Sequence, residues 1–505
     1  MPKAIIIGAG FGGIAASLRL RKKGYDVEII DRCLSIGGRA QVYESKGFKF
    51  DAGPTVLTAT FLFDDLFRLF GKQIDDYVTI KPLNPWYQFI FPDGRKFNYG
   101  GSIEDTLSEI EKFNPTDKVN YLNLLNESEK IYKVAFEDLS TEPFHSFKKM
   151  ASVSHHLILL KSYRSVWSFI SSHLKDPYLR QAFSIQPLLV GGNPFDTTSI
   201  YSLIHYLERK WGVHFALGGT GALLKGFEKL MLEEGIKITL NTSVQEIIIQ
   251  NGMAKGIKTK DNIIMNADII ISNTDAAFLY KNLIKKKYQS ISAKAKVKFA
   301  RYSMGLFVLY FGTSKKFNHI EHHTIWFGKR YKDLLADIFN HKILAEDFSL
   351  YLHRPTATDP SFAPDNCDSF YVLAPVPNLQ ASINWDKEGP KLRSRIIKAL
   401  DETIMPGLAR SIKVDFYKTP VDFHHDYCSV YGAGFSIAPL LSQSAWFRFH
   451  NKAEGIANLY LVGAGTHPGA GLPGVLCSAK AVDNLINPAR KLQTISLVKN
   501  ILLTQ

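Results

Sequence analysis

Near its start the chain reads Ala4-Ile5-Ile6-Ile7-Gly8-Ala9-Gly10-Phe11-Gly12-Gly13. An apolar run passes directly into a glycine-rich turn, and an Ala- and Leu-rich helical stretch continues to Lys23. Strand, turn and helix in this order predict a dinucleotide-binding βαβ unit. In such a unit Gly8 permits the tight turn, Gly10 lets the backbone approach a pyrophosphate, and Gly13 lets helix and strand pack closely. The start of the helix offers free amides to the phosphates.

An acidic residue follows the second strand of this unit. The strand, Asp26 to Ile30, ends at Asp31, and an acidic residue about 20 positions after the glycines is where the fold holds a ribose hydroxyl. A glycine fingerprint alone also occurs as a tight turn without a ligand, and Asp31 makes that alternative much weaker. The same start could be a secretory signal, but glycines interrupt its apolar run and no small-residue cleavage site follows. We therefore expect it to be part of the mature structure.

A second glycine-rich turn lies near the other end of the chain. After an apolar strand, Asn458 to Val462, the sequence reads Gly463-Ala464-Gly465-Thr466-His467-Pro468-Gly469-Ala470-Gly471-Leu472-Pro473-Gly474-Val475. This turn also leads into a helix, whose first amides can face a ligand. Two such turns at opposite ends of one chain predict a long cofactor held by N- and C-terminal segments that meet in space.

The composition is that of a globular chain. Of 505 residues, 46% are hydrophobic and 21% charged, which excludes a disordered majority. The length is compatible with around three domains, although large cofactor enzymes often build fewer from discontinuous segments. The four cysteines are far apart and form no C-x-x-C pair: Cys33, Cys367, Cys428 and Cys477. This spacing argues against a disulfide framework, a zinc site or a redox dithiol, so we expect no metal and a reducing cytoplasm.

The chain is strongly basic, with a formal net charge of +14. Such a charge favours an anionic partner, either nucleic acid or membrane headgroups. The densest basic stretch, Lys281 to Arg301, contains no acidic residue, but no helix-turn-helix, zinc finger or aromatic RNA-binding signature accompanies it. We therefore expect no nucleic acid partner, and a solvated face is as compatible with this stretch as a membrane contact.

A membrane contact on the surface is one possibility that the sequence leaves open. No apolar run approaches the ~18 residues that a spanning helix needs. Between Val153 and Ile170, however, apolar residues recur at near-helical spacing beside Lys161 and Arg164. The pattern fits an interfacial helix, and it fits an ordinary core-facing helix at least as well.

The remaining pattern suggests that the cofactor-binding part is discontinuous. Residues 73–213 are mostly helical in rhythm, and strands resume after a glycine-rich helix start at Gly218, with a hairpin signal at Asn251-Gly252. We predict an α/β fold with a Rossmann-like cofactor domain in three pieces, residues 1–72, 214–285 and 425–492. An inserted α+β domain, residues 73–213 and 286–424, is expected to bind substrate and to associate with a membrane.

The ordered motifs resemble a known family. The chain is similar over nearly its whole length to the bacterial-type phytoene desaturases, the flavin-dependent carotenoid desaturases, and looks most like the lycopene-forming ones. The resemblance rests on Gly8 to Gly13, Gly37-Gly38-Arg39, Asp51-Ala52-Gly53-Pro54-Thr55, Gly218-Gly219-Thr220-Gly221-Ala222-Leu223, Ala374-Pro375-Val376-Pro377, Gln443-Ser444-Ala445-Trp446-Phe447-Arg448, and Leu459 to Ala479. One departure is Cys477, where similar enzymes usually carry glycine.

The resemblance implies a glutathione-reductase-like, amine-oxidase-type flavoprotein with non-covalent FAD. It implies that the N-terminal turn and Asp31 hold the ADP half, that Gly38 and Arg39 lie beside the pyrophosphate and ribityl chain, and that Val244 meets the adenine. The C-terminal turn is expected to face the flavin. The full set of implied cofactor residues is Gly8, Ala9, Gly10, Phe11, Gly12, Gly13, Asp31, Arg32, Gly38, Arg39, Gly53, Pro54, Thr55, Val244, Gly463, Ala464, Thr466, Gly471, Pro473, Gly474 and Val475.

The implied reaction belongs to carotenoid biosynthesis. A phytoene-like polyisoprenoid would lose a hydride from an allylic carbon to flavin N5 in successive dehydrogenations to lycopene, and a weak base or water would take the neighbouring proton. His467 and Asp275 are weak candidates for that base, each equally compatible with a structural role. Quinone or oxygen would accept the electrons, and the enzyme would lie in the cytoplasm, peripherally associated with the inner membrane. The main alternatives are a diapophytoene (C30) desaturase and a flavin-dependent carotenoid isomerase. A prenyl-chain binding protein and an amine oxidase fit the motifs less well.

Overall fold

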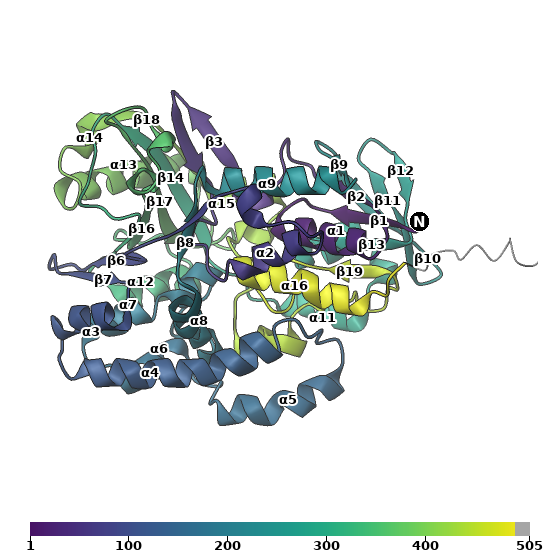
Figure 1. Ribbon diagram of the computed structural model, residues 1–505, viewed down its shortest axis with the longest axis horizontal. Coiled ribbons are helices and arrows are strands. Elements are labelled where there is room, and N and C mark those ends of the chain that lie inside the picture. The colour runs from purple at the N-terminus through teal and green to yellow at the C-terminus, as the bar shows by residue number, and fades with distance from the viewer. Residues whose placement is uncertain (490–505) are drawn as a thin grey trace, which may run out of the picture.

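A parallel sheet forms the centre of one of two lobes (Figure 1). The structure is a computed structural model that describes residues 1–489. Five strands have the order β19-β13-β1-β2-β9, and every neighbouring pair is parallel. Their bounds are β1 Lys3–Ile7, β2 Asp26–Ile30, β9 Lys237–Thr239, β13 Ile269–Ser272 and β19 Leu459–Leu461. Three distant stretches of sequence therefore build one sheet.

Alternating side chains of β1 are buried on both faces of this sheet. Ile6 packs into a core with three helices, α1 Phe11–Lys22, α9 Gly219–Glu233 and α16 Leu472–Leu485. Ile5 and Ile7 point to the other face, where they pack with an antiparallel sheet of β10 Val244–Gln250, β11 Met253–Thr259 and β12 Ile264–Asn266. The continuous apolar run of β1 follows from this double burial. The predicted hairpin at Asn251-Gly252 is confirmed, and both residues have positive φ.

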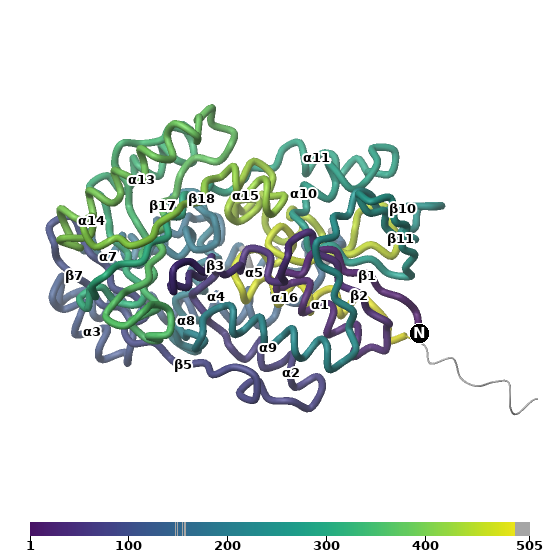
Figure 2. The backbone as a smooth tube through the Cα atoms, turned by 90° about the horizontal axis from the view of Figure 1, so that it is seen from above, coloured from purple at the N-terminus to yellow at the C-terminus, as the bar shows by residue number. Residues whose placement is uncertain are grey.

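The N- and C-terminal segments lie side by side, as predicted (Figure 2). The Lys23 ammonium pairs with the Asp483 carboxylate at 2.9 Å, and the Tyr25 hydroxyl donates to the Asn487 carbonyl at 3.0 Å. The Ala489 amide donates to the carbonyl of Lys23 at 2.9 Å. These contacts join α1 to α16 and to the residues after α16. The last three residues of the predicted cofactor domain, 490–492, lie outside the described residues.

A seven-stranded sheet forms the second lobe, in the order β18-β14-β17-β16-β15-β6-β7. Its strands are β6 Tyr87–Ile90, β7 Lys96–Tyr99, β14 Gly305–Thr313, β15 His323–Trp326, β16 Leu350–His353, β17 Asp368–Val376 and β18 Ile412–Lys418. Phe307, Leu309 and Phe311 of β14 face a core with α13 Trp385–Glu402. The alternate residues of β14, such as Leu306 and Val308, face the interior between the lobes.

Helices cover one side of the second lobe (Figure 1). They are α3 Ile103–Glu111, α4 Asp117–Tyr132, α5 Phe147–Leu159, α6 Val166–His173, α7 Pro177–Phe183, α8 Leu203–Trp211 and α12 Tyr331–Ala336. The pattern between Val153 and Ile170 belongs to two helices, α5 and α6, separated by a turn in which Lys161 has a φ of +50°. Among residues 1–489, none of the helices is both long and apolar enough to cross a bilayer.

Residues 73–213 contain three strands that the helical rhythm did not predict. Besides β6 and β7, β5 Ile80–Pro82 pairs with β8 His214–Ala216. β6 pairs with β15, more than 200 residues away in sequence. Strands this short gain their stability from distant partners, which a local pattern cannot show. The division of the chain into a cofactor and a substrate domain stays a prediction.

Candidate active site

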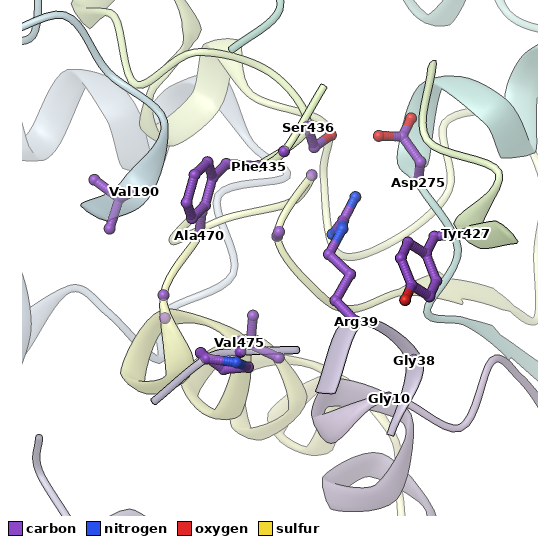
Figure 3. Close-up of a pocket in the computed structure, with 18 of the residues that line it drawn as sticks. Gly10, Gly38, Arg39, Val190, Asp275, Tyr427, Phe435, Ser436, Ala470 and Val475 are labelled. Atoms are coloured by element: carbon purple, nitrogen blue, oxygen red, sulfur yellow. The ribbon is translucent and has the colours of Figure 1, made fainter. Parts of the chain in front are cut away.

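A cavity of about 1330 Å³ lies between the two lobes and is lined by both. At one end it meets the two glycine-rich turns, and at the other it continues among apolar side chains of the second lobe. Of the predicted cofactor residues, most line it; Ala9, Gly13, Gly463 and Thr466 lie behind the lining. Figure 3 shows part of this wall, with Gly10, Gly38 and Val475 around one space.

The N-terminal turn is closely packed. The Gly8 amide donates to the Ile30 carbonyl at 2.8 Å, and Gly8 has a φ of +97°, which suits glycine. A Cβ on Gly13 would lie 2.0 Å from the Gly8 carbonyl oxygen. A Cβ on Gly12 would lie 3.1 Å from the Val475 side chain and 3.3 Å from the Gly463 amide nitrogen. Gly12 is thus the point at which the N- and C-terminal turns touch.

Asp31 is held at the end of β2 by the turn that precedes it. One carboxylate oxygen accepts the Ala9 amide hydrogen at 2.6 Å, and the other accepts that of Cys33 at 2.8 Å. The residue is buried and lines the cavity. A carboxylate accepts up to about four hydrogen bonds, so it keeps acceptor capacity for a ribose hydroxyl. The neighbouring Arg32 donates to the Cys428 sulfur at 2.8 Å.

Arg39 brings a positive charge to the cavity, and among residues 1–489 it forms no ion pair with a carboxylate. Its side chain reaches into the space beside Ser436 and Asp275 (Figure 3). One nitrogen donates to the Ser429 hydroxyl at 3.3 Å, while Nε is buried without a hydrogen-bond partner among residues 1–489. Burial lowers the pKa of this guanidinium, although Asp275 opposes the shift. A guanidinium stays charged in proteins, so this site fits an anionic group such as a pyrophosphate.

The C-terminal turn is supported from behind. The Ser478 hydroxyl accepts the Gly463 amide hydrogen at 2.8 Å, and the Thr466 hydroxyl donates to the Gly463 carbonyl at 3.0 Å. The residues of this turn that line the cavity are Ala464, Gly465, His467, Pro468, Gly469, Ala470, Gly471, Leu472, Pro473, Gly474 and Val475. Helix α16 begins at Leu472 directly after Gly471, whose φ is +90°. The positive end of a helix dipole therefore faces the cavity.

Asn273 joins the two turns and was missed as a site residue. Its side-chain amide donates to the Gly8 carbonyl at 3.3 Å, and its Oδ1 lies 2.6 Å from where a Cβ on Gly12 or Gly463 would be. Asn273 also lines the cavity. A signal was available, because Asn273 directly follows β13, and ligands of open parallel sheets bind at the carboxyl ends of the strands.

Both candidates for a catalytic base line the cavity, and each also has a structural partner. His467 Nε2–H donates to the Leu139 carbonyl at 2.9 Å, its ring packs against Phe144, and burial lowers its pKa to about 4. One oxygen of Asp275 accepts the amide hydrogens of Ala277 and Phe278 at 3.0 and 3.1 Å. His467 Nδ1 and the second Asp275 oxygen are buried without a hydrogen-bond partner in the described part of the chain.

The far end of the cavity is a wall of apolar side chains from α8, β14, β15, α12 and the segment before α8. They include Leu188, Val190, Ile200, Leu203, Ile204, Leu207, Met304, Leu306, Val308, Ile325, Phe327, Leu334, Leu335 and Ile338. Trp446 and Phe447, aromatic residues of one of the family motifs, do not line the cavity, and Phe447 is partly exposed on the surface.

One buried carboxyl interrupts this wall. Glu208 of α8 accepts the Tyr87 hydroxyl hydrogen at 2.8 Å, and its second oxygen has no hydrogen-bond partner among residues 1–489. Burial raises the pKa of Glu208 to about 7. The sequence did not point to this residue, because Glu208 stands beside Arg209 and Lys210 in a helix that looks solvated.

Comparison with known proteins places this chain in a family. Residues 11–482 match the family described as flavin containing amine oxidoreductase. The chain belongs to this family. It is 45% identical over 487 residues to a lycopene-forming phytoene desaturase of Pantoea ananas, covering 96% of this chain and 99% of that protein. It is 40% identical to a neurosporene-forming phytoene desaturase of Rhodobacter capsulatus, covering 98% and 95%.

Solved structures agree on the fold of this flavin-containing family member. An oxidoreductase from Methanosarcina mazei has a TM-score of 0.64 at 18% identity, covering 95% of this chain and 100% of that one. Cyclohexylamine oxidase from Brevibacterium oxydans has a TM-score of 0.60 at 13% identity, covering 96% and 98%. The expected amine-oxidase-type fold and resemblance to phytoene desaturases are confirmed. The protein is an oxidoreductase, and its cofactor is FAD.

Proposed function

We propose that the protein desaturates phytoene in successive steps that end at lycopene. The observation that carries this proposal is the continuity of the cavity, which runs from the two dinucleotide turns into the apolar wall of the second lobe. A long hydrocarbon has no polar group to bind, so such a wall is the surface that suits it. The similarity to lycopene-forming phytoene desaturases supports the same substrate.

For the cofactor we propose the placement implied by the turns. Asp31 and Val244 hold the adenosine half, and the amides at the start of α1 hold the pyrophosphate together with Arg39. Residues 53–55 and 464–475 face the flavin. Arg39 supports this placement because it is a cavity-facing cation that lacks an ion pair among residues 1–489. Ala9, Gly13, Gly463 and Thr466, which lie behind the lining, support the turns.

The bound flavin supplies a hydride acceptor. Each desaturation then removes one hydride and one proton from adjacent carbons, so a single C–C bond becomes double and the substrate loses two hydrogens. The apolar wall positions the chain and excludes water from the cation that hydride loss leaves on the substrate. His467 Nδ1 and the second oxygen of Asp275 remain proposals for the proton acceptor, because each is a buried acceptor atom on a residue that lines the cavity. A base with the low pKa of His467 suffices for so acidic a cation.

We also propose that a membrane delivers the substrate. Met150 and Val153 of α5 line the cavity, while Ile158 and Leu159 at the end of the same helix are 66% and 74% exposed. Helix α5 contacts the 3-10 helix Ala445–Phe447, on which Phe447 is partly exposed.

Helix α11, Ile291–Phe299, extends this surface. Its Lys296 ammonium donates to the Trp446 carbonyl at 3.3 Å, and Lys294, Lys298 and Phe299 are exposed. We call α5, Ala445–Phe447 and α11 the mouth surface. Exposed apolar residues beside lysines favour attachment to an anionic bilayer. Peripheral attachment to the cytoplasmic face of the inner membrane, with quinone or oxygen as electron acceptor, completes the proposal.

Purified protein with FAD, given phytoene in liposomes, tests the function. We expect new visible absorption bands from longer polyenes, with lycopene as the end product in pigment extracts. If the phytoene is recovered without such bands, the proposal fails. Turnover of the C30 substrate alone would assign a diapophytoene desaturase, and a change in double-bond geometry without oxidation would assign an isomerase. Oxidation of amines in buffer, independent of lipid, would assign an amine oxidase.

A further inference from the structure

Three histidines meet behind the cavity wall of the second lobe. His323 is the first residue of β15 and His322 directly precedes it, and His353 ends β16. The antiparallel register of these strands pairs His323 directly with His353. All three side chains are buried, with exposed fractions of 4%, 0% and 1%. Phe215 covers two of them, with ring centroids 4.6 Å from His322 and 6.0 Å from His353.

The ring nitrogens of this cluster converge, and not all have partners. One nitrogen from each ring lies within 4.8 Å of one nitrogen from each of the other two. The Nε2 atoms of His322 and His353 are 3.1 Å apart. His323 Nε2 and His353 Nδ1 are buried without a hydrogen-bond partner among residues 1–489. Buried polar atoms are normally paired, so two orphaned nitrogens in one cluster indicate a missing ligand.

Hydrogen bonds from outside the cluster orient two of the rings. His322 Nδ1 lies 2.7 Å from the Thr358 hydroxyl oxygen, and His323 Nδ1 lies 2.7 Å from that of Tyr351. If these Nδ1 atoms carry the hydrogens and donate them, both Nε2 atoms are lone-pair acceptors: that of His323 has no partner among residues 1–489, and that of His322 forms a hydrogen bond with His353 Nε2, which a bound ion would replace. Metal-binding histidines are commonly held in this way through their second nitrogen.

We propose that His322, His323 and His353 bind a divalent transition-metal ion, for which Zn²⁺ is the best match. Three neutral imidazoles without a carboxylate suit zinc better than calcium or magnesium, and a water completes a tetrahedral set. Zn–N bonds of about 2.0–2.1 Å put tetrahedral ligands roughly 3.3 Å apart. Because the three nitrogens already lie within 4.8 Å of one another, binding draws any pair together by at most about 1.5 Å. Arg354, which directly follows His353, is paired with Asp368 at 3.3 Å, which reduces its repulsion of the ion.

The ion would brace the cavity wall rather than join the reaction. Tyr351, which holds His323, lines the cavity and lies within hydrogen-bond distance of Thr55 at 3.0 Å. The site therefore links β15 and β16 to the segment that follows β4 Phe48–Asp51. It does not depend on the proposed desaturation. The cysteine spacing that argued against a zinc site says nothing about histidines brought together by strand pairing.

Metal analysis of the full chain tests the site without any activity assay. The protein, carrying no polyhistidine tag, is purified in metal-free buffer, and its zinc content is measured before and after addition of Zn²⁺ and removal of excess. We expect about one zinc per chain after loading. Replacement by Co²⁺ should give visible d–d absorption on the long-wavelength side of the flavin bands. His323→Gln and His353→Gln should weaken Co²⁺ binding at least tenfold, and Tyr351→Phe should weaken it roughly 10–100-fold.

His205→Gln is the matched control, because His205 is a fully buried histidine on α8 outside the cluster. It should bind Co²⁺ like the wild type, and flavin content with circular dichroism reports whether each variant is folded. If the cluster variants do not fold, the wild-type Co²⁺ spectrum decides. Zinc at background level after loading, an absent d–d band, or equal binding by wild type and folded His323→Gln would each overturn the proposal.

Discussion

The cavity is lined mainly by backbone at one end and by side chains at the other. Beside β1, β13 and β19 a Cβ added to Gly12 or Gly474 would lie 2.6 or 2.7 Å from a neighbouring atom. Beside β14 and α8, the lining consists of side chains such as Val308 and Leu207. Where glycine backbone lines the cavity, an added Cβ would clash with neighbouring atoms. Where side chains line it, substitutions can change its shape. The first end is therefore suited to one invariant cofactor, and the second to a substrate whose length can be selected.

The strictest test of the backbone end is Gly13→Ala. The new Cβ would lie 2.0 Å from the Gly8 carbonyl oxygen, so α1 must move away from β1 and the turn must open. We expect flavin affinity to fall more than 100-fold, measured by flavin absorbance of the purified protein and by titration with FAD. Gly252→Asn is the control: the site is an open hairpin turn and asparagine tolerates its positive φ. Normal flavin content in Gly13→Ala would contradict this account of the turn.

The side-chain end carries a buried carboxyl whose removal should change stability with pH. The folded-state pKa of Glu208, about 7, lies above the ~4.3 of a free glutamate. Between about pH 4 and pH 7 the unfolded chain loses this proton while the folded protein keeps it. The free energy of unfolding is therefore highest below about pH 4 and falls as the pH rises to about 7. Glu208→Gln keeps an acceptor for the Tyr87 hydroxyl and cannot ionise. We expect its free energy of unfolding, relative to wild type, to improve by roughly 2 kcal/mol between pH 5.5 and pH 8.

Chemical denaturation at the two pH values measures this difference. Glu104→Gln, on the exposed face of α3, should show no comparable change. Parallel pH dependence in wild type and Glu208→Gln would mean that Glu208 is ionised in the folded protein at neutral pH. The second end would then contain a charge, and its apolar character would need another explanation.

The sequence predicted the backbone end of the cavity better than the side-chain end, and the difference in their lining explains why. The turns at Gly8–Gly13 and Gly463–Val475 are contiguous, because a backbone site needs consecutive residues with special conformations, and so they could be recognised directly. The lining of the other end comes from β14, β15, α8 and α12, which only strand pairing and helix packing bring together. Glu208 illustrates the limit: its neighbours in sequence are charged, but its partner is Tyr87, 121 residues away.

The same reasoning explains the other residues that the sequence missed. His323 and His353 are 30 positions apart, and their contact arises from the register of β15 with β16. Asn273 was within reach, because it follows a strand that could be predicted. Trp446 and Phe447 are aromatic and stand in a family motif, but this segment lies near the surface beside α5.

A substitution that narrows the side-chain end should affect substrate and spare cofactor. Val308 faces the cavity from β14, so Val308→Phe places extra volume where the hydrocarbon is proposed to lie. We expect turnover of phytoene to fall roughly tenfold, with flavin content unchanged. Leu309→Met is the matched control, since Leu309 is the next residue on the same strand and points into the opposite core. Equal losses in both variants would indicate general damage to β14 rather than a blocked cavity.

The smallest effect is expected at the mouth surface, where the side-chain end meets its surroundings. Leu159 is 74% exposed at the end of α5, so Leu159→Glu should not disturb folding. Complete burial of a leucine side chain in a bilayer contributes about 1.5–3 kcal/mol to the free energy of binding. Because Leu159 is one of several inserting residues and is inserted only partly, we expect its replacement to weaken vesicle binding roughly fivefold. Co-sedimentation with anionic liposomes measures it. Ile264→Glu on β12 is the control, being 62% exposed on the other lobe. If both variants bind vesicles as the wild type does, the mouth surface is not the attachment site. If both variants lose binding, attachment depends on net charge rather than on α5.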